Sequence, residues 1–201
     1  MIGNDKLDFL RNGFIEKLKS GNTDLIPVWG KMNFQQMIEH MIDSVAIASG
    51  DLSYPLMSPP ERIDQMKAFA VGDKPFRENT PNPIIGEDTL PLRYNDMSES
   101  ILNLQAQIEK FINRFEADSD LLVENPFFGK MNFEEWVALL YKHAWHHLRQ
   151  FGIEKEKPVE QIINPESILS PLIGLRVLLF VCFFCLAWII TFVFRQYVSA
   201  S

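Results

Sequence analysis

Histidines are the side chains of this chain best suited to bind a metal ion, and their spacing indicates which of them can do so together. The sequence contains four: His40, His143, His146 and His147. On a helix, His143 and His147 would lie on one face with Cβ atoms about 5–6 Å apart, so both imidazoles can reach one cation. His146 would point roughly 100° away from that face. We therefore expect His146 to be a surface residue or to contact the site from outside.

A histidine pair on one helix needs a third ligand from another element, and His40 is the remaining histidine. Neutral imidazole nitrogens favour zinc, nickel, iron or copper over magnesium or calcium. Three protein ligands would leave a position for water or a substrate, so the predicted site of His40, His143 and His147 is open. The alternative is that H-x-x-x-H is a polar detail of a helix surface or core, and the spacing alone leaves this open.

Two acidic residues beside His40 are candidates for orienting a metal-bound imidazole. Asp43 follows His40 by about one helical turn on the same face, and Glu39 precedes it directly. Carboxylates commonly accept the second N–H of a ligating histidine, which fixes the ring and its tautomer. Asp43, Glu39 and His146 are also the available general bases, and the sequence does not select among them.

Five segments have the apolar spacing of helices, and two of them carry the histidines. The pattern predicts helices over residues 5–20, 34–48, 59–70, 96–116 and 133–151. Residues 71–95 contain four prolines and two glycines with little periodicity, so they are predicted to form a long connection. Almost no strand pattern competes with this interpretation. The predicted fold class is all-α.

Nearly the same short sequence introduces both histidine-bearing helices. Residues 29–34 are WGKMNF, and residues 128–133 are FGKMNF. In each copy the asparagine is followed three residues later by Gln36 or Glu135, a capping-box pattern that starts a helix. The similarity indicates either an internal pseudo-repeat of two helix pairs or a chance recurrence of common capping chemistry.

The C-terminal part of the chain differs in composition from the rest. Residues 177–194 contain no charge. Extension back to residue 172 gives a helix of about 34 Å, enough to cross a hydrocarbon core of about 30 Å if Arg176 reaches the headgroups. More basic residues precede this run than follow it, which places the preceding part in the cytoplasm. A wholly buried helix and a tail that is not native sequence are the alternatives.

These features predict a helical domain over residues 1–153, a linker over 154–171, a transmembrane helix over 172–194 and a short tail over 195–201. Residues 1–20 alternate charged with apolar residues, so we expect no secretory signal sequence. We therefore expect a membrane protein with a single-pass C-terminal anchor through residues 172–194 and a cytoplasmic N-terminal domain.

Charge and cysteine content narrow the classes of function. The net charge is −7, and residues 1–157 carry 17 basic against 24 acidic side chains. Such a domain would repel a phosphate backbone, so nucleic acid is not expected as a partner. Both cysteines, Cys182 and Cys185, lie in the apolar C-terminal run. The predicted domain therefore has no thiol for a disulfide or for cysteine chemistry.

The sequence around the histidines resembles a known family. WGKMNFQQMIEHMIDS, which contains His40, and NPFFGKMNFEEWVALLYKHAWHHLRQFGI, which contains His143 and His147, look like the DinB/YfiT-like metalloprotein superfamily and, within it, a bacterial branch of small uncharacterised proteins. The resemblance covers about residues 1–153. It implies a four-helix bundle in an up-down-down-up arrangement with a long crossover. It also implies that the three histidines hold one divalent transition metal, with zinc or nickel favoured.

For function, the resemblance implies a metal-dependent enzyme that acts on a small-molecule substrate. Related proteins include thiol-dependent S-transferases and a mycothiol-dependent isomerase, and others have hydrolase-like assignments. The expected reaction is therefore thiol-dependent S-transfer, with a low-molecular-weight thiol as a further cofactor, or hydrolysis. The alternative is a non-catalytic, membrane-tethered metal-binding or interaction module. A homodimer is left open, and the membrane helix departs from most relatives, which are soluble.

Overall fold

Helices make up most of the described chain, as the apolar spacing predicts. This computed structural model describes residues 3–80, 83–84 and 89–154. All five predicted helices are present, with ends within a few residues of the prediction. They are a first rod made of α1 (Gly3–Asp8), a π-helical turn (Phe9–Gly13) and α2 (Phe14–Ser20), then α3 (Phe34–Ala48), α4 (Ile63–Val71, after a 3-10 turn Pro60–Arg62), α5 (Met97–Ala117) and α6 (Phe133–Gln150).

The two histidine-bearing helices begin in the same way. The side chains of Asn33 and Asn132 each accept a hydrogen bond from the backbone N–H three residues further on. Gln36 and Glu135 reach back to the backbone N–H of these caps, which completes both predicted capping boxes. The repeated sequence therefore builds the same helix start twice.

Contacts between side chains give the directions of α3, α5 and α6. Ser100 in α5 donates to Glu39 in α3, and Gln107, two turns further along α5, donates to Ser49 at the end of α3. The helices α3 and α5 therefore run in the same direction. The rings of Phe34, at the start of α3, and Phe151, just after α6, have centroids 5.1 Å apart, so α3 and α6 are antiparallel.

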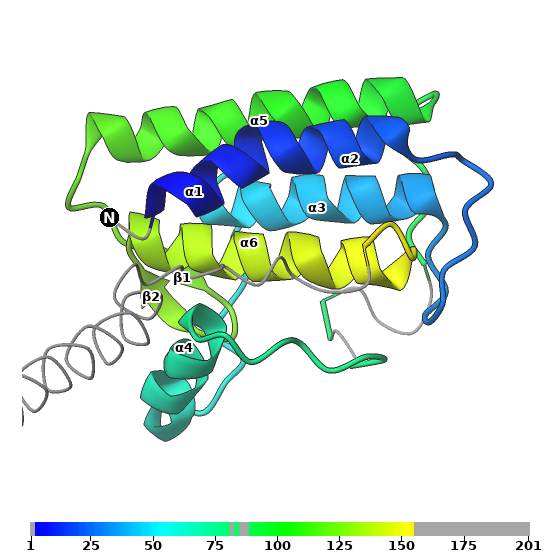
Figure 1. The fold of residues 1–201 in the computed structure, drawn as a ribbon. Coiled ribbons are helices and arrows are strands. Elements are labelled where there is room, and N and C mark those ends of the chain that lie inside the picture. The colour runs from blue at the N-terminus through cyan, green and yellow to red at the C-terminus, as the bar shows by residue number, and fades with distance from the viewer. Residues whose placement is uncertain (1–2, 81–82, 85–88, 155–201) are drawn as a thin grey trace, which may run out of the picture. The chain divides into compact units, whose positions relative to one another are not determined.

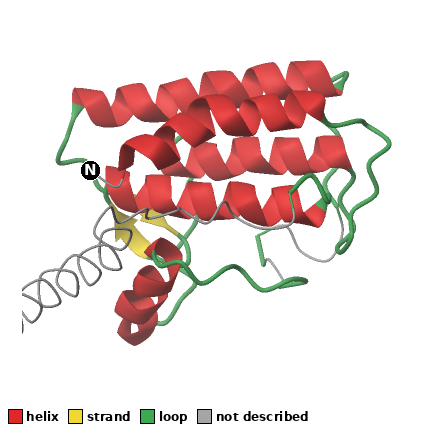
Figure 2. Cartoon of the chain, in the orientation of Figure 1, coloured by secondary structure: helices red, strands yellow, loops and turns green. Residues whose placement is uncertain are grey.

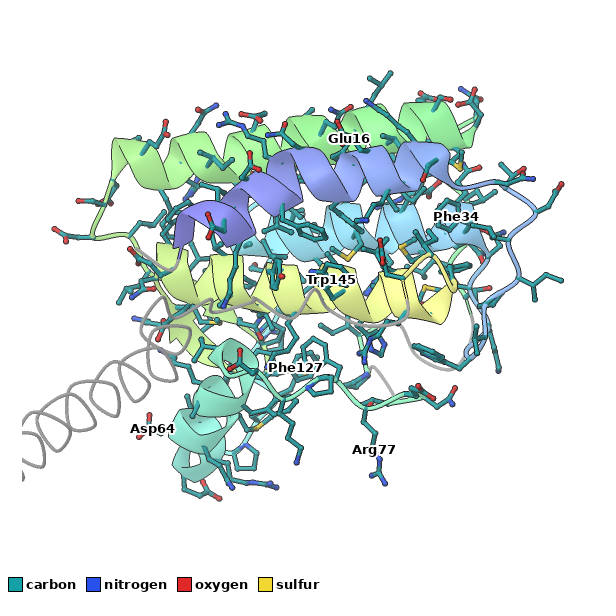
Figure 3. The ribbon with its side chains drawn as sticks, viewed as in Figure 1. Glu16, Phe34, Asp64, Arg77, Phe127 and Trp145 are labelled. Atoms are coloured by element: carbon teal, nitrogen blue, oxygen red, sulfur yellow. The ribbon has the colours of Figure 1, made fainter. Side chains whose placement is uncertain are left out.

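The first rod runs parallel to α6. The ring of Phe9 stacks on Trp145, and Lys17 forms an ion pair with Glu154 further along both segments. Together with the directions above, this gives the up-down-down-up arrangement that the resemblance implies (Figure 1). The core lies between these four rods, where Phe34 and Trp145 are almost completely buried (Figure 3).

The connection between α3 and α5 is long because parallel neighbours cannot be joined by a tight turn. It contains α4, and the described residues between α4 and α5 form loops and turns (Figure 2). A hairpin that we did not predict precedes α6: β1 (Val123–Asn125) pairs antiparallel with β2 (Gly129–Met131). Strands of three residues are too short to show a clear alternating pattern.

The predicted transmembrane helix over residues 172–194 and the tail over 195–201 lie outside the described residues, as does the linker apart from Glu154. Among the helices of residues 3–80, 83–84 and 89–154, none is long and apolar enough to cross a membrane.

Candidate metal centre

Three imidazoles from two antiparallel helices meet at one point. The Nε2 of His40, in α3, lies 3.1 Å from the Nε2 of His143, in α6. The Nε2 of His147 lies 2.8 Å from the same His143 atom. Potential ligand atoms of the three residues all lie within 4.8 Å of one another. The structure thus brings together the three residues predicted from their spacing, while metal binding by them stays a prediction.

Helix packing fixes where each imidazole points. Met37 and Met41 flank His40 on α3 and are almost completely buried, so α3 cannot rotate without exposing them. On α6, Ala144 and Leu148 are fully buried beside the two histidines. The ring centroids of His143 and His147 lie 4.6 Å apart, as expected for residues one turn apart.

A side-chain amide fixes the tautomer of His147. The Nδ1 of His147 lies 2.7 Å from Oε1 of Gln150, while Nε2 of Gln150 donates to the carbonyl oxygen of Trp29 at 2.9 Å. Because the NH₂ end of the amide is used by Trp29, its oxygen faces His147, and Nδ1–H of His147 donates to it. The Nε2 of His147 is therefore an unprotonated acceptor that faces the other two histidines.

Hydrogen bonds among the three imidazoles cannot satisfy the cluster on their own. Both short contacts meet at Nε2 of His143, which carries either one hydrogen or one lone pair. If it donates to His147, it has no second hydrogen for His40. If it accepts from His40, its lone pair faces the lone pair of His147. A single cation that accepts a lone pair from each ring removes this conflict.

The distances between the nitrogens also fit one small cation. Two nitrogens bound to zinc at about 2.0–2.1 Å lie about 3.3 Å apart at a tetrahedral angle and about 2.9 Å apart at a right angle. The separations of 3.1 Å and 2.8 Å within the cluster are close to these values. Each of the two contacts to His143 therefore has a spacing that two ligands of one transition metal can adopt.

Burial keeps the three imidazoles neutral. Burial, with a smaller contribution from His146, lowers the pKa of His40 from 6.5 to about 4. Burial and then the neighbouring histidines lower the pKa of His143 and His147 well below 6.5. At neutral pH the lone pairs are thus available to a metal, and no proton must be displaced first.

A family model described as the DinB superfamily matches residues 12–151, well over half of the chain. The chain belongs to the DinB superfamily. No curated protein and no solved structure matches it. The matched DinB region includes His40, His143 and His147, and thus the whole histidine cluster.

In this DinB protein, the two carboxylates near His40 bind Arg93 and orient no imidazole. Asp43 accepts from Nη1 of Arg93 at 2.6 Å. Glu39, which is 4% exposed, accepts from the backbone N–H groups of Arg93 and Tyr94 and from the hydroxyl of Ser100. Burial raises the pKa of Glu39, but hydrogen bonds from Arg93, Gln35 and Tyr94 outweigh burial and lower it below its ordinary value. The expectation that Glu39 or Asp43 orients a histidine ring is therefore wrong.

The imidazole of His146 lies beside the cluster, between two aromatic rings. Its centroid is 5.7 Å from that of Trp29 and 5.9 Å from that of Phe76. Phe76, from the crossover, also lies edge-on to His143 at 6.0 Å. These rings give the histidine cluster of the DinB protein an apolar cover on one side.

A pocket open to solvent lies on another side of the cluster, where His40 forms part of its wall. The walls combine apolar and charged groups, among them Met32, Leu90, Pro91, Asp43 and Arg93. His40 thus connects the histidine cluster of the DinB protein to this small pocket.

Sequence reasoning missed Gln150, Trp29 and Phe76. A signal existed for Gln150, because a residue three positions after His147 lies on the same helix face. No comparable signal exists for Trp29 or Phe76, because tertiary packing alone brings these loop residues to α6.

Proposed function

We propose that this DinB protein is a metal-dependent enzyme that acts on a small molecule, with His40, His143 and His147 as the metal ligands. One observation carries the proposal: three neutral imidazoles direct their Nε2 atoms to one point, and their hydrogen bonds cannot satisfy one another there. A divalent transition metal, zinc or nickel by preference, would supply the Lewis acidity that holds a thiol or a water molecule as its anion.

The side chains around the cluster support a small-molecule substrate. Three protein ligands leave at least one coordination position open. On one side Phe76 packs against His143 and Trp29 against His146, and a small pocket lies beside His40. Because Leu90 and Pro91 form part of that pocket, we propose a partly apolar substrate. The proposed reaction is thiol-dependent S-transfer, with a low-molecular-weight thiol as second cofactor, or hydrolysis.

A non-catalytic metal-binding module is the second candidate, and one observation favours it. In the described part of the chain, both carboxylates nearest His40 are engaged by Arg93, so neither Glu39 nor Asp43 is free to act as a general base. In that case the metal would only brace α3 against α6, and the domain would serve as an interaction module.

We further propose that residues 172–194 tether the protein to a membrane, with the N-terminal domain in the cytoplasm. The uncharged run and the larger number of basic residues before it support this placement. A tether would confine the metal site to the region near the membrane surface, where it would meet small molecules that partition there.

Metal content and turnover of the full-length protein test the function. The protein is purified in detergent without chelator, its metal is quantified, and thiols are screened against electrophiles and hydrolysable esters. His143→Ala is the matched control. A stoichiometric metal with turnover that this variant lacks supports the enzyme, whereas stoichiometric metal without turnover favours the module. Failure to take up zinc or nickel, even on reconstitution, overturns both.

A further inference from the structure

The side-chain amide of Gln150 connects the histidine cluster to the loop between α2 and α3. Gln150 is the last residue of α6 and is 3% exposed. Its Oε1 accepts from His147, and its Nε2 donates to the carbonyl oxygen of Trp29. Its backbone carbonyl accepts from Val28 N–H at 2.7 Å. A single buried residue thus holds both an imidazole of the cluster and two consecutive residues of a distant loop.

The backbone at Gly30 shows how closely this loop approaches the amide. Gly30 has a φ of +80°, and a Cβ at this position would lie 2.6 Å from Nε2 of Gln150. A side chain there would be strained by the backbone conformation and would also push the amide away. Glycine at position 30, in the WGKMNF segment, is therefore required for Gln150 to reach Trp29.

We infer that Gln150 is a positioning residue that fixes the His147 tautomer for metal binding and, through its NH₂ group, anchors the loop at Trp29. Rotation of the amide by half a turn would place its NH₂ against Nδ1–H of His147 and its oxygen against the Trp29 carbonyl, so both hydrogen bonds would be lost together. The bond to Trp29 thus determines which end of the amide faces the histidine. This inference rests on the proposed function, because it takes the cluster to be a metal site.

Substitutions of Gln150 can distinguish the effect of its hydrogen bond with His147 from that of its hydrogen bond with Trp29. Gln150→Glu keeps an acceptor for Nδ1–H of His147 but replaces the donor to Trp29 with an oxygen. Gln150→Leu removes both contacts. Gln107→Leu is the matched control, because it removes a partly buried glutamine that binds Ser49 and Asp51 instead.

The test uses full-length protein in detergent micelles and two measurements. In metal-free protein, ¹⁵N NMR of the imidazoles should show His147 protonated at Nδ1 in the wild type, Gln150→Glu and Gln107→Leu, and a tautomer mixture in Gln150→Leu. In zinc titrations, Gln150→Leu should bind about 10–100-fold more weakly than the wild type, while Gln150→Glu and Gln107→Leu stay close to it. Hydrogen exchange at the Val28 amide should speed up in both Gln150 variants.

The outcomes distinguish this inference from the proposed function. If NMR shows that His147 of the wild type is protonated at Nε2, Gln150 does not have the inferred role. The inference is also overturned if Gln150→Leu binds zinc as tightly as Gln107→Leu. If the wild type binds no zinc, the proposed function fails. In that case, NMR of the metal-free protein still shows whether Gln150 fixes the tautomer of His147.

Discussion

The Nε2 atoms of His40 and His143 lie 3.1 Å apart, although 103 positions separate these residues in the chain. The contact joins α3 to the antiparallel α6, so the cluster bridges an early helix and a late one. His143 and His147 on α6 would hold an ion through only two protein ligands if α3 contributed none. The predicted metal site therefore depends on His40 as much as on the H-x-x-x-H pair.

We expect His40→Ala, His143→Ala and His147→Ala each to lower the affinity for zinc by orders of magnitude, because each leaves only two of three ligands. His146→Ala should retain one ion per chain, since the ring of His146 packs on Trp29 and Phe76 outside the cluster. Metal stoichiometry after dialysis measures both effects. Full retention by His40→Ala, or loss in His146→Ala alone, would show that the ligand assignment is wrong.

Metal binding should stabilise the fold, because the ion bridges two helices that separate on unfolding. At a free zinc concentration of about 1,000 times Kd, the free energy of unfolding should rise by about 4 kcal/mol. For a domain of this size that corresponds to an increase in Tm of roughly 10 °C. Thermal scans with zinc and with chelator give the shift, and His143→Ala should show almost none. Equal melting of the wild type in both conditions would contradict the prediction.

Without metal, the protein should lose stability as the pH falls below 6.5. Burial lowers the pKa of His40 from 6.5, the ordinary value of an exposed imidazole, to about 4 in the folded protein. Between these values the unfolded chain binds a proton that the folded chain does not, so protonation favours unfolding. Well above pH 6.5 neither state is protonated at His40 and the effect is absent.

His40→Gln isolates this contribution, because glutamine does not titrate. Between pH 7.5 and pH 5, the wild type should lose about 2 kcal/mol more unfolding free energy than His40→Gln. Urea denaturation in the presence of chelator measures the difference. Parallel pH profiles for the two proteins would show that His40 titrates normally in the folded state.

The full-length protein should sediment with membranes and resist carbonate extraction, because residues 177–194 carry no charge. Replacement of Phe184 and Leu186 by arginine should release it, since a charge at the centre of a span costs roughly 2.5–3.5 kcal/mol on insertion scales. Fractionation of cells that express each form is the measurement. Wild-type protein in the soluble fraction without detergent would exclude the span.

Local patterns in the sequence were enough to predict the helices and the pair of His143 and His147, whereas His40 was added to the pair only as the remaining histidine. The i, i+4 spacing of His143 and His147 and the capping boxes at Asn33 and Asn132 depend only on nearby residues. The resemblance added the up-down-down-up arrangement, which the observed contacts confirm. Long-range contacts were not predictable in this way.

Glu39 and Asp43 illustrate this limit. Their proximity to His40 in the sequence suggested that they orient its ring. Consecutive residues of a helix point about 100° apart, so Glu39 faces α5 instead. Asp43 lies on about the same face of α3 as His40. Its carboxylate, however, accepts a hydrogen bond from Arg93, which lies at the far end of the crossover. Nothing in the sequence near α3 indicates that Arg93 returns to this position.

Glu39 and Asp43 form a matched pair for testing what holds the crossover on the bundle. Both bind the guanidinium of Arg93, but only Glu39 is almost completely buried, and it also accepts from backbone N–H groups of Arg93 and Tyr94 and from Ser100. Glu39→Ala would leave these donors without a buried acceptor, which we expect to cost about 2–4 kcal/mol of unfolding free energy. Asp43→Ala removes a partly exposed ion pair and should cost less than about 1 kcal/mol. Urea denaturation of both variants decides the matter: equal losses would mean that the ion pair with Arg93, and not the buried hydrogen-bond network, anchors the end of the crossover.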